Sequence, residues 1–173
     1  MKKILVIFLF LTLTFTANIV KADIPHFIDF SKVLNQSTAG KKAQDFLKKK
    51  FASEKNKFKN TEESLKKEET QLISQKKIIT SEEYSKKVEA LRKKVSNLQN
   101  EKRKSINDIA KLRSQAKNQL LKALNPIIKK YMEDNKIRLV LDKKSILLGD
   151  QNLEITKQII EILNKEVKSL KLN

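Results

Sequence analysis

Residues 51–80 read FASEKNKFKNTEESLKKEETQLISQKKIIT and decide the fold of this chain. Within this stretch a large apolar side chain recurs every seven residues, which is the spacing of helices that pack along a shared seam. The recurring side chains are Phe51, Phe58, Leu65, Leu72 and Ile79. The companion positions of the repeat, Glu54, Thr61 and Glu68, are polar, so the predicted apolar stripe is narrow.

A second helix is predicted to begin directly after this stretch. Thr80 and Glu83 have the spacing of a capping box, in which two side chains close the first turn of a helix. Apolar residues then resume in two heptad series, which are interrupted at Lys102 and Ser105. The first series is Tyr84, Leu91, Leu98 and Leu112, and the second is Val88, Val95, Ile109 and Ala116.

The two heptad segments predict an antiparallel helical hairpin over residues 41–122, a coiled-coil arm with its tip near residues 76–82. Neither proline nor glycine occurs in this range. About 35 residues per helix, at a rise of 1.5 Å per residue, give an arm of roughly 50 Å. Such a hairpin buries only its shared seam, so we expect most of the arm's surface to face solvent.

The positive charge of the chain is concentrated on this predicted arm. Residues 41–122 carry 24 Lys and Arg against 11 Asp and Glu, a net charge of +13, while the whole chain has +18. Only four of the 38 basic residues are arginine, which limits bidentate recognition of phosphate groups. The pattern fits a binding surface for acidic partners, and it equally fits a solvated coiled coil whose lysines keep it soluble.

The composition excludes several chemistries. The 173 residues include two Gly, two Pro, one His and no Cys, so a glycine-rich phosphate loop cannot be built. A Cys/His zinc site or a Ser-His-Asp triad would have to use His26, the single imidazole. Adjacent acidic residues, such as Glu62 and Glu63, point to different sides of a helix and form no acid–base pair. We expect neither an enzyme nor a cofactor or metal site.

The first 22 residues are typical of a secretory signal peptide. Lys2 and Lys3 form a basic start, residues 4–17 are uncharged and mostly apolar, and Ala22 ends a plausible cleavage sequence. We expect cleavage after Ala22. The alternative is an uncleaved membrane anchor, because Ile4–Val20 reaches the lower limit of a spanning helix. Export disfavours nucleic acid as a partner, since nucleic acid is scarce outside the cytoplasm.

Both ends of the remaining chain predict short strands. Asp23–Phe30 favours a strand, Ser31–Leu34 a turn of helix, and Ser37 an N-cap for the long helix that follows. Near the other end, Asn125-Pro126 predicts a kink or a helix start.

The C-terminal segment predicts a β-hairpin and a last helix. Ile137–Leu141 and Ser145–Leu148 are rich in β-forming residues, and Asp142-Lys143-Lys144 between them favours a turn. Thr156 is expected to cap the last helix.

Three short strands make a sheet that is too small to stand alone with open edges. Other copies of the chain could close it into a barrel. The predicted fold is therefore α+β, mainly α: a long antiparallel helical-hairpin arm projects from a small β body, residues 23–40 and 123–173, completed by association of copies. The number of copies does not follow from this argument.

Short motifs at both ends are similar to one known family. Residues 27–35, FIDFSKVLN, and 37–41, STAGK, resemble the opening of the Skp (OmpH-like) periplasmic chaperones. Residues 139–143, LVLDK, 153–156, LEIT, and 160–164, IEILN, resemble its closing block. Thr38 and Glu154 depart from the family pattern, in which proline and aspartate are usual at these places.

The resemblance implies a homotrimer with a small β-barrel body and three helical arms around a cavity. It also implies location in the periplasm and an ATP-independent holdase role, in which unfolded outer-membrane proteins are kept soluble before membrane insertion. Basic arms would attract acidic clients over about a Debye length, roughly 8 Å at physiological salt. Contacts from several arms would then add by avidity.

Residues at and beside the predicted tip are the candidate client contacts. They are Lys76, Lys77, Ile78, Ile79, Tyr84, Lys86 and Lys87. The alternative interpretation is that Ile78, Ile79 and Tyr84 only seal the end of the hairpin. Two other functions fit the sequence: an envelope polyanion binder, for lipopolysaccharide or an anionic membrane surface, and a structural coiled-coil adaptor.

Overall fold

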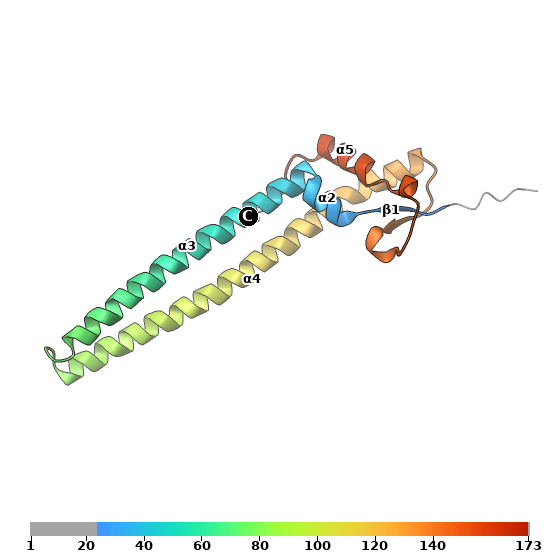
Figure 1. Ribbon diagram of the computed structural model, residues 1–173. Helices are drawn as coiled ribbons and strands as arrows, with labels where there is room; N and C mark the ends of the chain where they lie inside the picture. Colours follow the sequence, from blue (N-terminus) through green and yellow to red (C-terminus); the bar gives the residue numbers. More distant parts are fainter. Residues whose placement is uncertain (1–23, 173) are drawn as a thin grey trace, which may run out of the picture.

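The computed structural model describes residues 24–172 (Figure 1). The predicted signal peptide lies outside these residues. The elements, in chain order, are β1 (His26–Ile28), α2 (Phe30–Gln36), α3 (Thr38–Gln75), α4 (Ser81–Asp134), β2 (Val140–Asp142), the 3-10 turns η1 (Lys143–Ser145) and η2 (Gln151–Leu153), and α5 (Thr156–Glu166). No helix among residues 24–172 is long and apolar enough to cross a membrane.

The two longest helices lie side by side and run in opposite directions (Figure 1). We call α3 and α4 the helical pair. Side-chain caps explain where each helix begins: the Ser37 hydroxyl accepts a hydrogen bond from the Gly40 N–H at 3.1 Å, and Thr80 forms a capping box with Glu83. The predictions of both caps are confirmed. Gly40 also lets α2 approach α3, because a Cβ there would lie 2.1 Å from the Leu34 carbonyl oxygen.

α4 is longer than α3 and extends into a compact end that we call the body, where α2, α5 and the strands pack around it (Figure 1). The centre of the body is apolar and buried. Its buried side chains are Ile28, Val33, Ala39, Leu120, Leu124, Ile127, Ile137, Ile155, Ile159 and Leu163. Burying one such leucine or isoleucine stabilises the folded state by about 1.5–3 kcal/mol relative to leaving it exposed. One continuous helix therefore joins the body to the helical pair.

Pro126 does not start a helix. It lies inside α4, which continues to Asp134. The neighbouring Ile127 packs in the buried core of the body, and this packing holds the helix together across a residue that lacks a backbone N–H donor.

The sheet differs from the predicted one. β1 pairs in parallel with β2, with Phe27 opposite Leu141, and a single parallel bridge joins Phe27 to Glu154 on the other side. The predicted β-hairpin is wrong: after β2 the Asp142 carboxylate accepts a hydrogen bond from the Lys144 N–H at 3.1 Å, and the chain turns into η1. β2 thus takes its partner from the opposite end of the chain.

Two further local predictions need correction. β1 ends at Ile28, short of the expected Phe30, because the Asp29 carboxylate accepts a hydrogen bond from the Lys32 N–H and begins α2. Thr156 is the first residue of α5 and does not cap it. Its buried hydroxyl accepts a hydrogen bond from the Asp29 N–H at 2.8 Å, and so ties α5 to the start of α2.

Candidate functional site

The turn between α3 and α4 lies at the far end of the helical pair from the body (Figure 1), and its sequence is apolar and basic. Residues 76–80 form this turn, and the Ile78 and Ile79 N–H groups both bond to the Gln75 carbonyl. Ile78 is 81% exposed, while Ile79 and Tyr84 are half-buried. Ile78 therefore does not seal the end of the pair, whereas Ile79 and Tyr84 are partly packed.

The four lysines predicted as client contacts are all exposed around this turn. The Lys76 ammonium lies 6.0 Å from the centre of the Tyr84 ring, within the range of a cation–π contact. Lys87 donates a hydrogen bond to Gln75, and Lys86 pairs with Glu82 at 2.7 Å. An exposed ion pair of this kind stabilises the fold by only about 0–1 kcal/mol, so a partner can replace it at little cost. All four lysine charges are therefore accessible to a partner.

Along the helical pair, polar contacts cross the seam between the two helices. Glu68 pairs with Lys94 at 2.6 Å, Glu62 pairs with Lys102, and the Ser105 hydroxyl donates to Glu54 at 3.3 Å. One polar companion position of α3, Glu54, therefore lies at the interruption in the α4 heptads, whereas another, Glu68, lies opposite Lys94. These polar contacts across the seam reduce the apolar area that the two helices can bury against each other.

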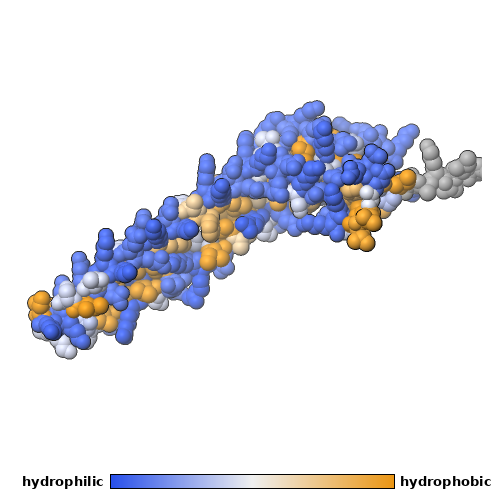
Figure 2. Space-filling view, in the orientation of Figure 1, coloured by the Kyte–Doolittle hydropathy of each residue, from blue (hydrophilic) through white to orange (hydrophobic). Residues whose placement is uncertain are grey.

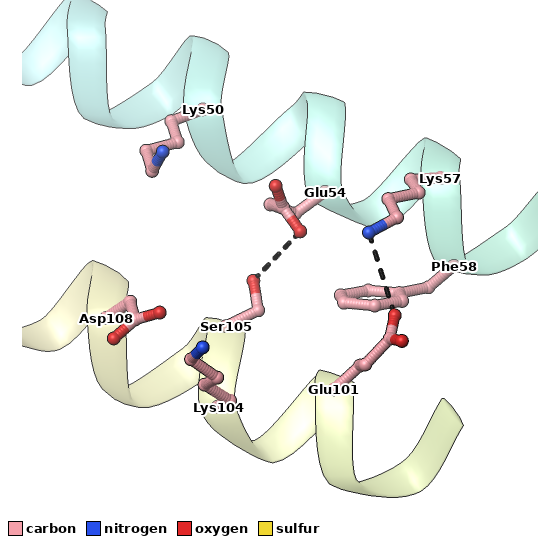
Figure 3. Close-up of a pocket in the computed structure, with 8 residues that line it drawn as sticks. All are labelled: Lys50, Glu54, Lys57, Phe58, Glu101, Lys104, Ser105 and Asp108. Atoms are coloured by element: carbon pink, nitrogen blue, oxygen red, sulfur yellow. Dashed lines mark hydrogen bonds and ion pairs between the residues drawn. The ribbon is translucent and has the colours of Figure 1, made fainter. Parts of the chain in front are cut away.

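One face of the pair beside the Glu54–Ser105 contact is charged (Figure 3). Lys50 and Lys57 on α3 and Glu101, Lys104 and Asp108 on α4 line a hollow there. The Lys57 ammonium lies 3.6 Å from the Glu101 carboxylate and 5.8 Å from the Phe58 ring. Charges of both signs on this face partly neutralise one another.

The opposite face of the pair is apolar. Two adjoining hollows of about 910 and 350 Å³ lie along it and share Phe51 and Ile109 as lining residues. Phe51 is 55% exposed and Ile106, in the smaller hollow, is 64% exposed. Figure 2 shows apolar patches along the pair between hydrophilic side chains. We call this surface, from Ala43 to Glu62 on α3 and from Lys102 to Lys117 on α4, the apolar groove.

Sequence reasoning did not identify the apolar groove. Phe51 was expected in the buried seam, and Ile106 belonged to neither heptad series. A signal was nevertheless present, because an apolar stripe with polar companions is too narrow to cover phenylalanine side chains from both sides. Ile106 also stands directly beside Ser105, one of the two residues that interrupt the series.

The body carries both exposed apolar side chains and an open strand edge. Leu147 is 96% exposed, Leu148 is 90% exposed, and Leu139, which precedes β2, is 48% exposed. Within residues 24–172, β2 has β1 as its single strand partner. An open strand edge and exposed leucines are surfaces on which another chain can pair.

A charged cluster fastens the loop after β2 to the body. The Glu154 carboxylate lies 2.9 Å from the Lys143 ammonium and 3.9 Å from that of Lys32. The hydrogen bond from Lys143 holds the pKa of the Glu154 carboxyl below its ordinary value, and the same contact raises the pKa of Lys143. The Lys143 ammonium also lies 5.9 Å from the ring of Phe27 in β1. These contacts tie Glu154 to the loop after β2 and to α2.

His26 lies in β1 and is partly buried. Among residues 24–172, no group of three or more His, Asp or Glu side chains is placed to hold a metal ion. Several acidic side chains are paired with lysines: Glu62 and Glu68 across the helical pair, and Glu154 within the body.

Fold and surface together define a class of protein: a small α/β body that presents a long, basic and partly apolar pair of helices. The sequence profile of the outer membrane protein (OmpH-like) family matches residues 26–163. The chain belongs to this OmpH-like family. A search of curated proteins found no match.

A crystal structure from Caulobacter crescentus CB15 has a similar fold. It is of a protein provisionally described as an outer membrane chaperone (OmpH-like). The TM-score is 0.80 at 18% sequence identity, and the match covers 87% of this chain and 90% of the other. At this identity the likeness shows a shared fold.

Proposed function

We propose that this chain is a periplasmic, ATP-independent holdase, which binds unfolded outer-membrane proteins and prevents their aggregation before membrane insertion. The observation that carries the proposal is the surface of the helical pair, where exposed apolar side chains stand among lysines. Unfolded outer-membrane strands alternate apolar and polar residues and aggregate through their open edges. A surface with apolar contacts and diffuse positive charge can hold such segments without a defined sequence.

Membership in the OmpH-like family supports this function, as does the fold shared with the Caulobacter protein. The exposed tip supports it as well, because Ile78 and the four surrounding lysines are accessible for contact with a client. We propose these tip residues as a first contact, at which charge attraction raises the rate of capture.

Association into a homotrimer is part of the proposal. The open edge of β2 and the exposed leucines at positions 139, 147 and 148 favour completion of the sheet by other copies of the chain. Several helical pairs on one body would then act on the same client, and weak contacts would add by avidity.

The test is suppression of aggregation. A urea-unfolded outer-membrane protein is diluted into buffer with the mature chain, and light scattering is followed. We expect scattering to fall strongly at one assembly per client, without added ATP. Unchanged scattering at this ratio would exclude the holdase function; an equally basic folded protein serves as the control for charge alone.

The competing functions predict different results in the same buffers. A binder of lipopolysaccharide or of an anionic membrane surface that relies on lysines alone loses binding steeply with salt. A holdase with apolar contacts keeps part of its affinity at high salt. A structural adaptor suppresses no aggregation and retains a folded partner instead.

A further inference from the structure

We infer that the apolar groove is a binding site for a single extended segment of an unfolded chain, one strand long, with apolar residues at every second position and acidic residues between them. This inference rests on the proposed holdase function and adds the site that holds the client after capture. It differs from the tip, which lies at the far end of the helical pair.

The first argument is the apolar surface left uncovered. Phe51 and Ile106 project from α3 and α4 into the smaller hollow, and both are more than half exposed. Phe58 and Ile109 line the same hollow and are only half covered. An apolar ligand that covers these four side chains removes a continuous apolar surface from water, which favours binding.

The second argument is the shape of the groove. From Ala43 to Glu62 it follows α3 for 19 residues, which at 1.5 Å per residue is about 28 Å. An extended chain rises about 3.3 Å per residue, so roughly eight or nine residues fit along it. Strands of outer-membrane barrels have about 9–11 residues, with one apolar side, and so match the length of the groove.

The third argument is charge. Lys48 and Lys55 on α3 and Arg113 and Lys117 on α4 stand along the two hollows. None of the four forms an ion pair with a carboxylate within residues 24–172. The groove also holds carboxylates, of which Glu62 is paired with Lys102. The groove therefore combines exposed apolar side chains with four cations that are unpaired within the described part of the chain, and these can accept acidic residues between the apolar side chains of a ligand.

The test compares two double variants. Phe51→Gln with Ile106→Gln removes apolar side chains from the groove, and Ile73→Gln with Val95→Gln removes exposed ones outside it, at 61% and 42% exposure. The probe is a fluorescent ten-residue peptide in which valine alternates with aspartate, and binding to the full mature chain is measured by anisotropy. We expect at least tenfold weaker binding for the groove variant and less than twofold for the control.

Crosslinking to a client gives a second readout that does not depend on a destabilised variant. A photo-crosslinking residue is placed at position 106, in the groove, or at position 104, on the charged face. With a urea-unfolded outer-membrane protein we expect several-fold more crosslinked product from position 106. Equal product from both positions would overturn the groove site, even if aggregation is still suppressed.

Other outcomes are equally decisive. Equal loss of peptide binding in both double variants would overturn the inference, because binding would then depend on general hydrophobicity. If the groove variant binds the peptide normally but has a different molar mass from wild type, the groove is a contact between copies of the chain, and the inference is overturned. Failure of the wild-type chain to suppress aggregation would refute the holdase function, whereas a selective loss of peptide binding would still support the groove.

Discussion

At the scale of single residues, Glu154 links separate parts of the body. It is an acidic side chain held by two lysines, and it joins the loop after β2 to α2 and, through Lys143, to Phe27. Its pKa is lowered mainly by the hydrogen bond from Lys143. A carboxyl whose pKa is lower in the folded state stabilises the fold above its unfolded pKa, and this contribution is lost as the pH falls through the folded pKa.

Glu154→Gln should therefore destabilise the body at neutral pH. We expect a loss of about 1–2 kcal/mol in the free energy of unfolding at pH 7, since the hydrogen bond is charge-assisted but partly exposed. Denaturant titrations at pH 7 and pH 3 test this. The gap between wild type and variant should shrink at pH 3, below the ordinary pKa of 4.5, and an unchanged gap would contradict the assignment.

At the scale of elements, α4 shows how one helix serves two structures. Its N-terminal part packs against α3 along a seam that polar contacts cross, and it lines the apolar groove. Its C-terminal part crosses the core of the body. Leu120 is fully buried there, while the next residue, Leu121, is 36% exposed. The periodicity of the helix places these two neighbours on different sides.

Leu120→Ala should destabilise the body far more than Leu121→Ala. Removing a leucine side chain from a filled core costs about 2–5 kcal/mol, because a cavity remains, while the exposed site should lose less than about 1 kcal/mol. Thermal unfolding followed by circular dichroism measures both. Similar melting temperatures for the two variants would show that α4 packs on the body through another face.

At the scale of the whole molecule, the proposed assembly depends on a surface that a single chain leaves open. Substituting Leu147→Ser with Leu148→Ser should weaken a homotrimer, because both side chains are almost fully exposed in the single chain and have no role in its core. Light scattering should give the mass of three mature chains for wild type and a lower mass for the variant at micromolar concentration.

The exposed tip offers a control for this experiment. Ile78→Ser removes a similarly exposed apolar side chain at the opposite end of the molecule, and we expect the mass to remain that of wild type. A folded wild-type monomer would contradict the proposed assembly. A monomeric Ile78→Ser variant would place the contact between copies at the tip.

The sequence alone determined the helical pair, its turn and both of its caps, because these features depend on local signals. A heptad repeat, a capping box and the absence of Pro and Gly act within a few residues of one another. The family resemblance seen in the end motifs was also confirmed, because the family profile matches residues 26–163.

Only the tertiary structure decided how the sheet pairs and which face of the helical pair stays exposed. β-forming residues on both sides of Asp142 predicted a local hairpin, yet β2 pairs with β1, more than 100 residues away in sequence. Likewise, Phe51 follows the heptad spacing and is still exposed, because the partner helix places Ile106 and Ile109 beside it without covering it. Burial depends on what the rest of the chain brings to a residue, and a repeat in the sequence cannot specify that neighbour.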